Sequence, residues 1–160
     1  MSIIEGLHPR IRPMAFDFIA KAKTAGIDIK ITNGTRTFQE QQDLYDQGRT
    51  KPGKIVTKAK PGQSFHNFSL AIDIVPIVKG KAVWNDETLW QKLGVIGESI
   101  GFEWGGRWKF VDKPHFQFPR GTKYTTLMQL KMAGDVDQDG YVILSLWTGS
   151  KNITVKDSHQ

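Results

Sequence analysis

The chain has 160 residues, of which 39% are hydrophobic and 24% are charged, as in one ordinary soluble domain. No apolar run approaches the roughly 20 residues of a membrane span, and the lack of cysteine excludes disulfides, thiol nucleophiles and thiolate metal sites. Lysine and arginine exceed aspartate and glutamate by 22 − 16 = 6. This excess favours anionic partners such as nucleic acid, lipid headgroups or bacterial wall polymers.

The first third of the chain predicts a helix, a strand and a second helix. Apolar residues repeat at helical spacing over residues 10–26. Strict alternation of apolar and polar residues over 27–31 predicts a half-buried strand. Thr37 and Glu40 then have the spacing of a capping box, which predicts a helix that ends at Gly48.

The middle of the chain predicts a long basic loop followed by strands and a third helix. Residues 49–65 combine five basic side chains with two Pro-Gly pairs, and loops of this length are commonly functional or disordered. Apolar residues over 70–78 predict a strand, which a turn joins to a second strand at 82–84. Helical spacing over 89–100 predicts the third helix.

The last third predicts shorter elements. A loop rich in glycine and tryptophan over 103–108 leads to a strand at 115–118, and residues 122–132 predict a short helix. An acidic loop at 135–140 and a strand-like run at 141–147 follow. Helices and strands mix without regular βαβ alternation, so we expect the α+β class.

Two of the four histidines stand close to carboxylates in the sequence. We expect His8 and His159, near the two ends, to be solvated. His66 precedes Asp73 by seven residues, and Asp73 lies within an apolar strand, where a buried carboxylate is costly unless a cation or several donors compensate it. Periodicity alone leaves open whether Asp73 faces solvent instead.

Together with His115, these residues have the composition of a catalytic metal site. Two imidazoles and one carboxylate make three ligands for Zn²⁺, with the fourth position left to water. Pro114 disfavours a helix at the preceding residue, so we place Asp112 and His115 at a loop–strand junction. Asp112 would then be free to act as the base on that water. The His-Glu-x-x-His pattern of helix-borne zinc proteases is absent.

Taken in order, Ser64-x-His66-x6-Asp73 and Asp112-x-Pro114-His115 resemble the LAS-type (VanY-like, M15) zinc peptidases. The likeness is greatest to the L-alanyl-D-glutamate endopeptidases of phage endolysins and Bacillus-type wall hydrolases, and it covers roughly residues 5–120. Further matching segments are Leu7-His8-Pro9, Thr35-Arg36-Thr37, Glu40-Gln41, Leu44-Tyr45, Gln47-Gly48-Arg49-Thr50, Gly62-Gln63 and Gly101-Phe102-Glu103-Trp104-Gly105-Gly106. Several motifs must occur together, which makes the resemblance specific.

The resemblance implies a central antiparallel sheet flanked by helices, with zinc held by His66, Asp73 and His115. It implies that Asp112 is the catalytic acid and base. It also implies that Arg36 holds the substrate and stabilises the oxyanion, although the residues alone also allow a surface salt bridge for Arg36.

Three further residues are expected near the substrate by the same resemblance: Ser64, Gln41 and Trp108. Core packing remains an alternative for Trp108. Ser69 stands where the family usually has glycine, which is favoured where φ is positive or backbones approach closely. This substitution removes no ligand, but it favours a distorted or slower site.

The implied activity is zinc-dependent cleavage of the L-Ala–D-Glu bond of peptidoglycan stem peptides by a monomeric phage endolysin. Two alternatives stay open: a D-Ala-D-Ala carboxypeptidase of the same fold, and a non-catalytic wall-binding module. Residues 1–6 have no basic stretch before a long apolar one, so we expect synthesis in the host cytoplasm without a signal peptide and action on the wall after release.

The excess of positive charge fits this activity better than other partners. No nucleic-acid motif accompanies it, and no membrane insertion is expected. Stem peptides carry carboxylates that the basic loop at 49–62 would attract, although a solvated loop without a binding role is the alternative.

The acidic loop is a candidate calcium site. Asp135, Asp137 and Asp139 occupy positions 1, 3 and 5 of an EF-hand loop, Gly140 occupies position 6 and Tyr141 would supply position 7. Position 12 is leucine instead of the usual glutamate. An acidic turn without metal is the alternative. We expect residues 1–132 to form the catalytic domain and 133–160 to be an extension packed on it.

Overall fold

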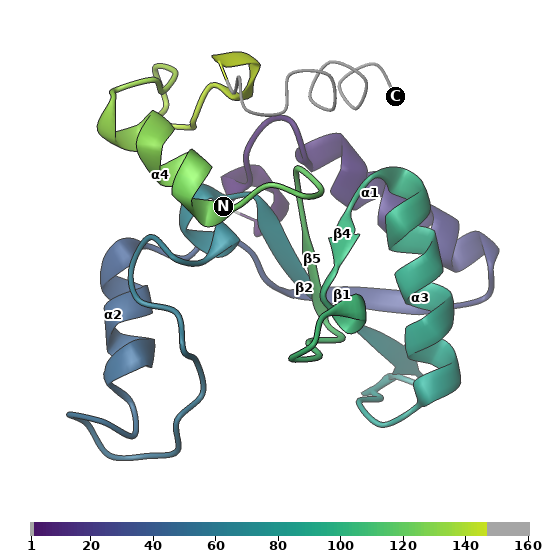
Figure 1. Cartoon of the computed structure of the whole chain (residues 1–160). Helices are drawn as coiled ribbons and strands as arrows, with labels where there is room; N and C mark the ends of the chain where they lie inside the picture. Colours follow the sequence, from purple (N-terminus) through teal and green to yellow (C-terminus); the bar gives the residue numbers. More distant parts are fainter. Residues whose placement is uncertain (1, 147–160) are drawn as a thin grey trace.

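An antiparallel sheet of five strands forms the centre of the protein, as seen in the computed structural model, which describes residues 2–146 (Figure 1). The strand order is β1-β2-β5-β4, and β3 pairs with β2. The strands are β1 (Asp28–Asn33), β2 (Ala71–Val78), β3 (Lys81–Ala82), β4 (Glu103–Trp104) and β5 (His115–Gln117). The expected α+β class with a central antiparallel sheet is confirmed.

The chain also forms four helices, and short 3₁₀ turns connect several of the elements. The helices are α1 (Arg12–Thr24), α2 (Phe38–Asp46), α3 (Glu87–Ile100) and α4 (Tyr124–Met132). The 3₁₀ turns are η1 (Ile4–Gly6), η2 (Phe65–Phe68), η3 (Gly105–Arg107) and η4 (Leu144–Leu146). No helix among residues 2–146 is both long and apolar enough to cross a membrane.

Helices α1 and α3 lie side by side against the sheet and enclose the aromatic core (Figure 1). The ring of Phe18 on α1 meets that of Phe116 on β5 edge to face, with centroids 4.8 Å apart, a favoured arrangement of aromatic pairs. Gly97 lets α3 approach this pair, because a Cβ at that position would collide with the Phe116 ring. The helices therefore cover one face of β5 and leave the other face for different side chains.

Strand pairing brings the chemistry-bearing residues to that other face. Asp73 on β2 is the register partner of His115 on β5 and also of Asn33 on β1. Ile72 pairs with Phe116 and is fully buried in the core. Because successive side chains of a strand alternate between faces, Asp73 and His115 lie together on the face away from the core.

The helix starts follow the sequence closely. Thr37 and Glu40 form the expected capping box at the start of α2, with their reciprocal bonds at 3.0 and 2.8 Å. Asp86 caps α3 by accepting a hydrogen bond from the backbone N–H of Leu89. Gly101, where α3 ends, has a φ of 121°, which a residue with a side chain rarely adopts.

Two expectations about local structure are wrong, and the bounds of one strand differ from those expected. Residues 103–104, expected in a loop, form β4, because Trp104 pairs with Phe116 and is buried. The short strand expected at 82–84 lies at 81–82. The run at 141–147 is no strand within the described residues: Val142 makes an isolated bridge to Val136 and a 3₁₀ turn follows, while residue 147 lies outside the described residues.

The expectation that His8 is solvated is also wrong. The residue is 7% exposed, and its Nε2 lies 2.8 Å from the carbonyl oxygen of Val142. The backbone N–H of Arg10 donates to Nδ1. A partner so distant in sequence explains why local pattern could not place this side chain. His159 lies outside the described residues.

Candidate metal centre and active site

Three candidate ligand atoms converge on the open face of the sheet. His66 comes from η2, Asp73 from β2 and His115 from β5. Asp73 Oδ1 lies 3.3 Å from His66 Nε2 and 3.3 Å from His115 Nδ1, and the three ligating atoms all lie within 4.8 Å of one another. Both histidines are buried, and they are the pair that the sequence selected.

The second nitrogen of each ring has a fixed partner that sets the tautomer. His66 Nδ1 lies 2.7 Å from the carbonyl oxygen of Gly34, and His115 Nε2 lies 2.8 Å from Gln117 Oε1. Each oxygen accepts an N–H, so the nitrogen facing Asp73 carries a lone pair in the neutral ring. Lone pairs converging on a carboxylate need a cation between them, and this donor set suits a metal. Among residues 2–146 no other such group converges.

Electrostatics at the group favour positive charge. Burial acts to raise the pKa of Asp73, but His115 and His66, when they carry a proton on the nitrogen that faces the carboxylate, outweigh it by hydrogen bond and charge and hold that pKa far below its ordinary value. Burial acts to lower the pKa of His115, but the bond to Asp73 and its charge raise it. Asn33 Nδ2 donates to Asp73 Oδ2 at 3.1 Å and steadies the carboxylate.

The backbone holds Asp112 beside this group. Its N–H donates to the carbonyl of Gly105 at 2.9 Å, and its own carbonyl accepts from the N–H of His115 at 3.2 Å. A Cβ at Gly105 would collide with the Asp112 carbonyl oxygen, so the close approach needs glycine. Although the residue as a whole is exposed, desolvation of the carboxyl group and the charge of Asp73 raise the pKa of Asp112.

Arg36 is tied to the same turn as His66. Its backbone N–H donates to the carbonyl of His66 at 3.0 Å, and its Nη1 donates to Gln41 Oε1 at 3.1 Å. Gln41 is fully buried, and its Nε2 donates to the carbonyl of Ala59 at 2.8 Å. Both the oxygen and the nitrogen of the Gln41 amide are thus hydrogen-bonded, so this buried side chain fixes the orientation of the Arg36 guanidinium.

Trp108 and Ser64 each contact one of the two candidate ligand histidines. The Trp108 ring centroid lies 5.1 Å from that of His115, and its indole N–H donates to Glu103. Ser64 Oγ accepts from the backbone N–H of His66 at 3.2 Å and so caps η2. Trp108 packs on one imidazole and Ser64 shapes the turn that carries the other.

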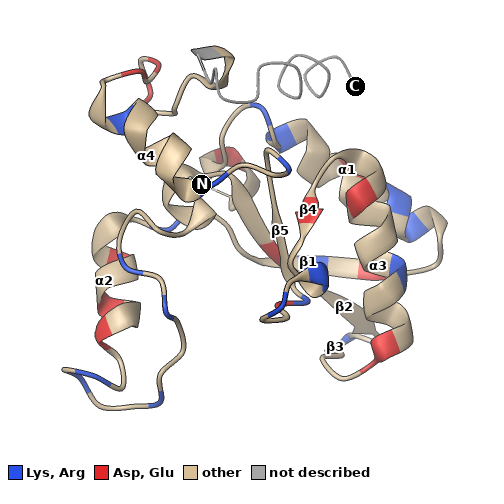
Figure 2. Ribbon diagram, in the orientation of Figure 1, with Lys and Arg blue, Asp and Glu red and all other residues tan. Residues whose placement is uncertain are grey.

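The basic loop reaches across to the loop that carries Asp112. Figure 2 shows blue segments along the chain that follows α2. Lys58 Nζ lies 4.4 Å from the centre of the Phe110 ring, within range of a cation–π interaction. A single β-bridge joins Lys51 in this loop to Gln47 just before it. Local contacts therefore hold the loop in place, and Lys58 lies against the loop that carries Asp112.

The acidic loop is closed by its own hydrogen bonds. Asp137 Oδ1 accepts from the backbone N–H groups of Asp139 and Tyr141 at 2.8 and 3.0 Å, and the carbonyl of Tyr141 accepts from the N–H of Asp137. Asp135 is part of no converging metal group within the described residues. Calcium binding there stays a prediction.

A family model described as D-alanyl-D-alanine carboxypeptidase matches residues 57–118. The peptidoglycan L-alanyl-D-glutamate endopeptidase CwlK of Bacillus subtilis (strain 168) is 43% identical over 127 residues, which cover 73% of this chain and 76% of that protein. The chain belongs to the M15 peptidase family. An L-alanyl-D-glutamate peptidase of Listeria phage A118 is 33% identical over 101 residues, which cover 61% of this M15 chain and 32% of the phage protein.

A solved structure shares the M15 fold seen here. It is the vancomycin-resistance D,D-pentapeptidase VanY, an E175A mutant from a VanB-type cassette in complex with Zn(II). The TM-score is 0.54 at 18% identity, over 70% of this chain and 72% of that one. The expected family is thus confirmed.

Proposed function

We propose that this protein is a zinc metallopeptidase that cleaves the L-Ala–D-Glu bond in peptidoglycan stem peptides. The observation that carries the proposal is the convergence of His66, Asp73 and His115. The tautomer of each histidine is fixed by a hydrogen bond from its other ring nitrogen. The names of the Bacillus and Listeria phage relatives support this bond as the target, and the Zn(II) in the VanY structure supports the metal.

The chain's own residues supply the rest of the chemistry. Zinc bound by the three ligands would lower the pKa of a water toward neutrality and polarise the scissile carbonyl. Asp112 accepts the proton of that water and returns it to the nitrogen of the leaving amine. The Arg36 guanidinium stabilises the negative oxygen of the tetrahedral state.

Mass spectrometry of defined muropeptides tests the proposal. The purified protein is incubated with a disaccharide tetrapeptide, with and without a chelator. We expect L-Ala to stay on the sugar and a peptide beginning with D-Glu to be released. The reaction should stop on chelation and return with zinc. Intact muropeptide in the presence of bound zinc would refute the peptidase and leave a non-catalytic wall-binding module.

A second candidate is removal of the terminal D-Ala. The matching family model carries the description of a D-alanyl-D-alanine carboxypeptidase. The same experiment on a pentapeptide separates the two activities, since the carboxypeptidase would release free D-Ala and leave L-Ala–D-Glu intact.

We further propose a phage endolysin role, in which a monomer acts on the wall after release from the cytoplasm. The Listeria phage relative supports it. The sedimentation velocity of the pure protein tests the monomer. Calorimetry with millimolar Ca²⁺ tests the calcium site of Asp135, Asp137, Asp139 and Tyr141, and a flat titration would reject it.

A further inference from the structure

A hollow lined by aromatic and aliphatic side chains begins at Asp112. It has a volume of about 220 Å³, and its lining residues are Trp84, Trp90, Val111, Asp112, Lys113 and Pro114. Whole small-molecule sites usually measure roughly 300–1,000 Å³. The hollow is therefore sized for one ring or one side chain of a larger substrate.

The walls of the hollow combine a fixed indole with an exposed one. Trp90 is 1% exposed and donates its indole N–H to the Trp84 carbonyl at 2.8 Å, which anchors the backbone there. The Trp84 side chain is 50% exposed, and Val111 is 58% exposed. Large apolar side chains left open beside reacting groups mark a binding surface. Lys113, which pairs with Glu87, adds a polar edge.

The chemistry of the substrate limits what could fill this hollow. The residues on either side of the scissile bond, L-Ala and D-Glu, offer a methyl group and a carboxylate, and neither has a face that would stack on the open Trp84 indole. The sugar that carries the peptide does offer a matching surface, because one face of a pyranose ring presents C–H groups that stack on aromatic rings. Its hydroxyl and acetamido groups can meet polar side chains at the rim.

Chain length brings that sugar close to Asp112. The carbonyl under attack belongs to L-Ala, whose nitrogen is acylated by the lactyl group of N-acetylmuramic acid. One residue spans at most about 3.6 Å, so the sugar follows the reacting carbonyl almost directly. A second hollow, of about 360 Å³, is lined by Arg36, Asn33 and Glu40. Its polar walls suit the charged continuation of the peptide.

We propose that the hollow beside Trp84 is a subsite for the N-acetylmuramic acid ring, so that the enzyme binds the glycan as well as the peptide. This subsite rests on the proposed L-Ala–D-Glu activity. It gives the substrate a direction, with the sugar beside Trp84 and the peptide continuing past Arg36. Glycan-bearing substrates are then preferred over free stem peptides.

The test compares kcat/KM for a muramyl tetrapeptide and the free tetrapeptide of the same sequence. We expect the wild type to favour the muramyl substrate by about tenfold, which corresponds to about 1.4 kcal/mol. Trp84→Ala should lose that preference and leave cleavage of the free peptide within about twofold. Trp84→Phe, which keeps a flat ring, should retain most of it. Phe16→Ala removes an exposed aromatic ring from α1 and should change neither value.

Several results would overturn the subsite while the proposed activity stands. A wild type that cleaves both substrates equally well would do so, as would a Trp84→Ala protein that loses both activities in proportion. A concentration-dependent dimer abolished by Trp84→Ala, with the preference unchanged, would assign this face to a second copy of the chain. Failure of the zinc-loaded wild type to cleave either substrate would instead reject the proposed function, and the subsite with it.

Discussion

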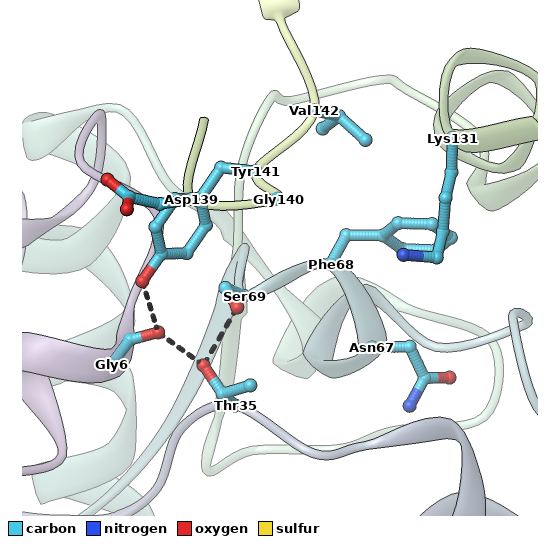
Figure 3. A pocket seen from close by; sticks show the side chains of 10 residues that line it. All are labelled: Gly6, Thr35, Asn67, Phe68, Ser69, Lys131, Asp139, Gly140, Tyr141 and Val142. Carbon is cyan, nitrogen blue, oxygen red and sulfur yellow. Dashed lines mark hydrogen bonds between the residues drawn. The ribbon is translucent and has the colours of Figure 1, made fainter. Parts of the chain in front are cut away.

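The hydroxyl groups of Ser69 and Thr35 lie 2.9 Å apart and join the turn that carries His66 to the segment that carries Arg36 (Figure 3). Thr35 also bonds to the carbonyl of Gly6 at 2.7 Å. Both hydroxyls border a hollow of about 380 Å³ that α4 and the acidic loop help to close. Ser69 has a φ of 62°, in the left-handed region that favours glycine, and its hydroxyl makes a bond that a glycine would lack.

Substitutions at Ser69 should separate the backbone effect from the hydrogen bond. Ser69→Gly loses a bond worth about 1 kcal/mol but relieves a left-handed conformation that costs about as much, so its free energy of unfolding should stay near that of the wild type. Ser69→Ala loses the bond and keeps the strain, and should be about 1 kcal/mol less stable than Ser69→Gly. Urea unfolding measures both. An alanine variant as stable as the glycine variant would contradict this account.

Replacing Asp112 by asparagine should stop catalysis without releasing the metal. General acid–base groups contribute about 10²–10⁴-fold, so kcat should fall at least about 100-fold. Zinc content, measured by atomic absorption, should stay at the wild-type level, whereas His66→Ala should lose both. Asp17→Asn, on the exposed surface of α1, is the matched control. Loss of zinc from Asp112→Asn would make Asp112 a ligand.

Gln117 should matter for metal affinity although it is no ligand. It accepts the N–H of His115, and loss of such partners typically costs 10–100-fold in affinity. We expect Gln117→Leu to weaken zinc binding by about that factor in a competition titration with a chelator. Gln91→Leu changes the same residue type on the exposed side of α3 and should leave zinc affinity unchanged.

The stability that His8 provides should depend on pH. Burial lowers the pKa of His8, against the pull of the Val142 carbonyl, so the folded protein holds the neutral ring while the unfolded chain protonates near pH 6.5. The contribution is therefore complete above pH 6.5 and is lost as the pH falls from there toward the lowered pKa.

His8→Leu isolates this contribution, because the other titrating groups are common to both proteins. The variant should be about 1–3 kcal/mol less stable than the wild type at pH 7.5. The difference should shrink at pH 5.5 when urea unfolding is measured at both values. A difference that stays constant between the two would show that His8 does not titrate in this range.

The sequence predicted the part of the site that local spacing encodes. Strand periodicity put Asp73 among apolar neighbours and left open whether it faces a cation or solvent. The resemblance to the zinc peptidases then implied that it binds the metal. Gln117 could also have been found, because residues two apart on a strand share a face and it follows His115 by two. Nothing local signalled Asn33, whose contact with Asp73 depends on how β1 pairs with β2.

The errors share a physical cause, which is pairing between distant segments. Trp104 stands in a glycine-rich stretch that looks like a loop until Phe116 pairs with it. His8 is a polar residue near the start of the sequence, and only its hydrogen bond to the distant Val142 carbonyl explains why it is buried. Alternating apolar and polar residues also made 141–147 resemble a strand. Val142 and Leu144 are instead buried against the core without joining a sheet.

The bond from His8 to Val142 joins residues 134 positions apart, and this has a consequence for building hybrid lytic enzymes. A junction placed at residue 132 would remove the acceptor of a buried imidazole together with the apolar cover of Val142 and Leu144. A module from another protein should therefore be attached after Leu144, so that any chimera keeps the acidic loop together with the catalytic residues.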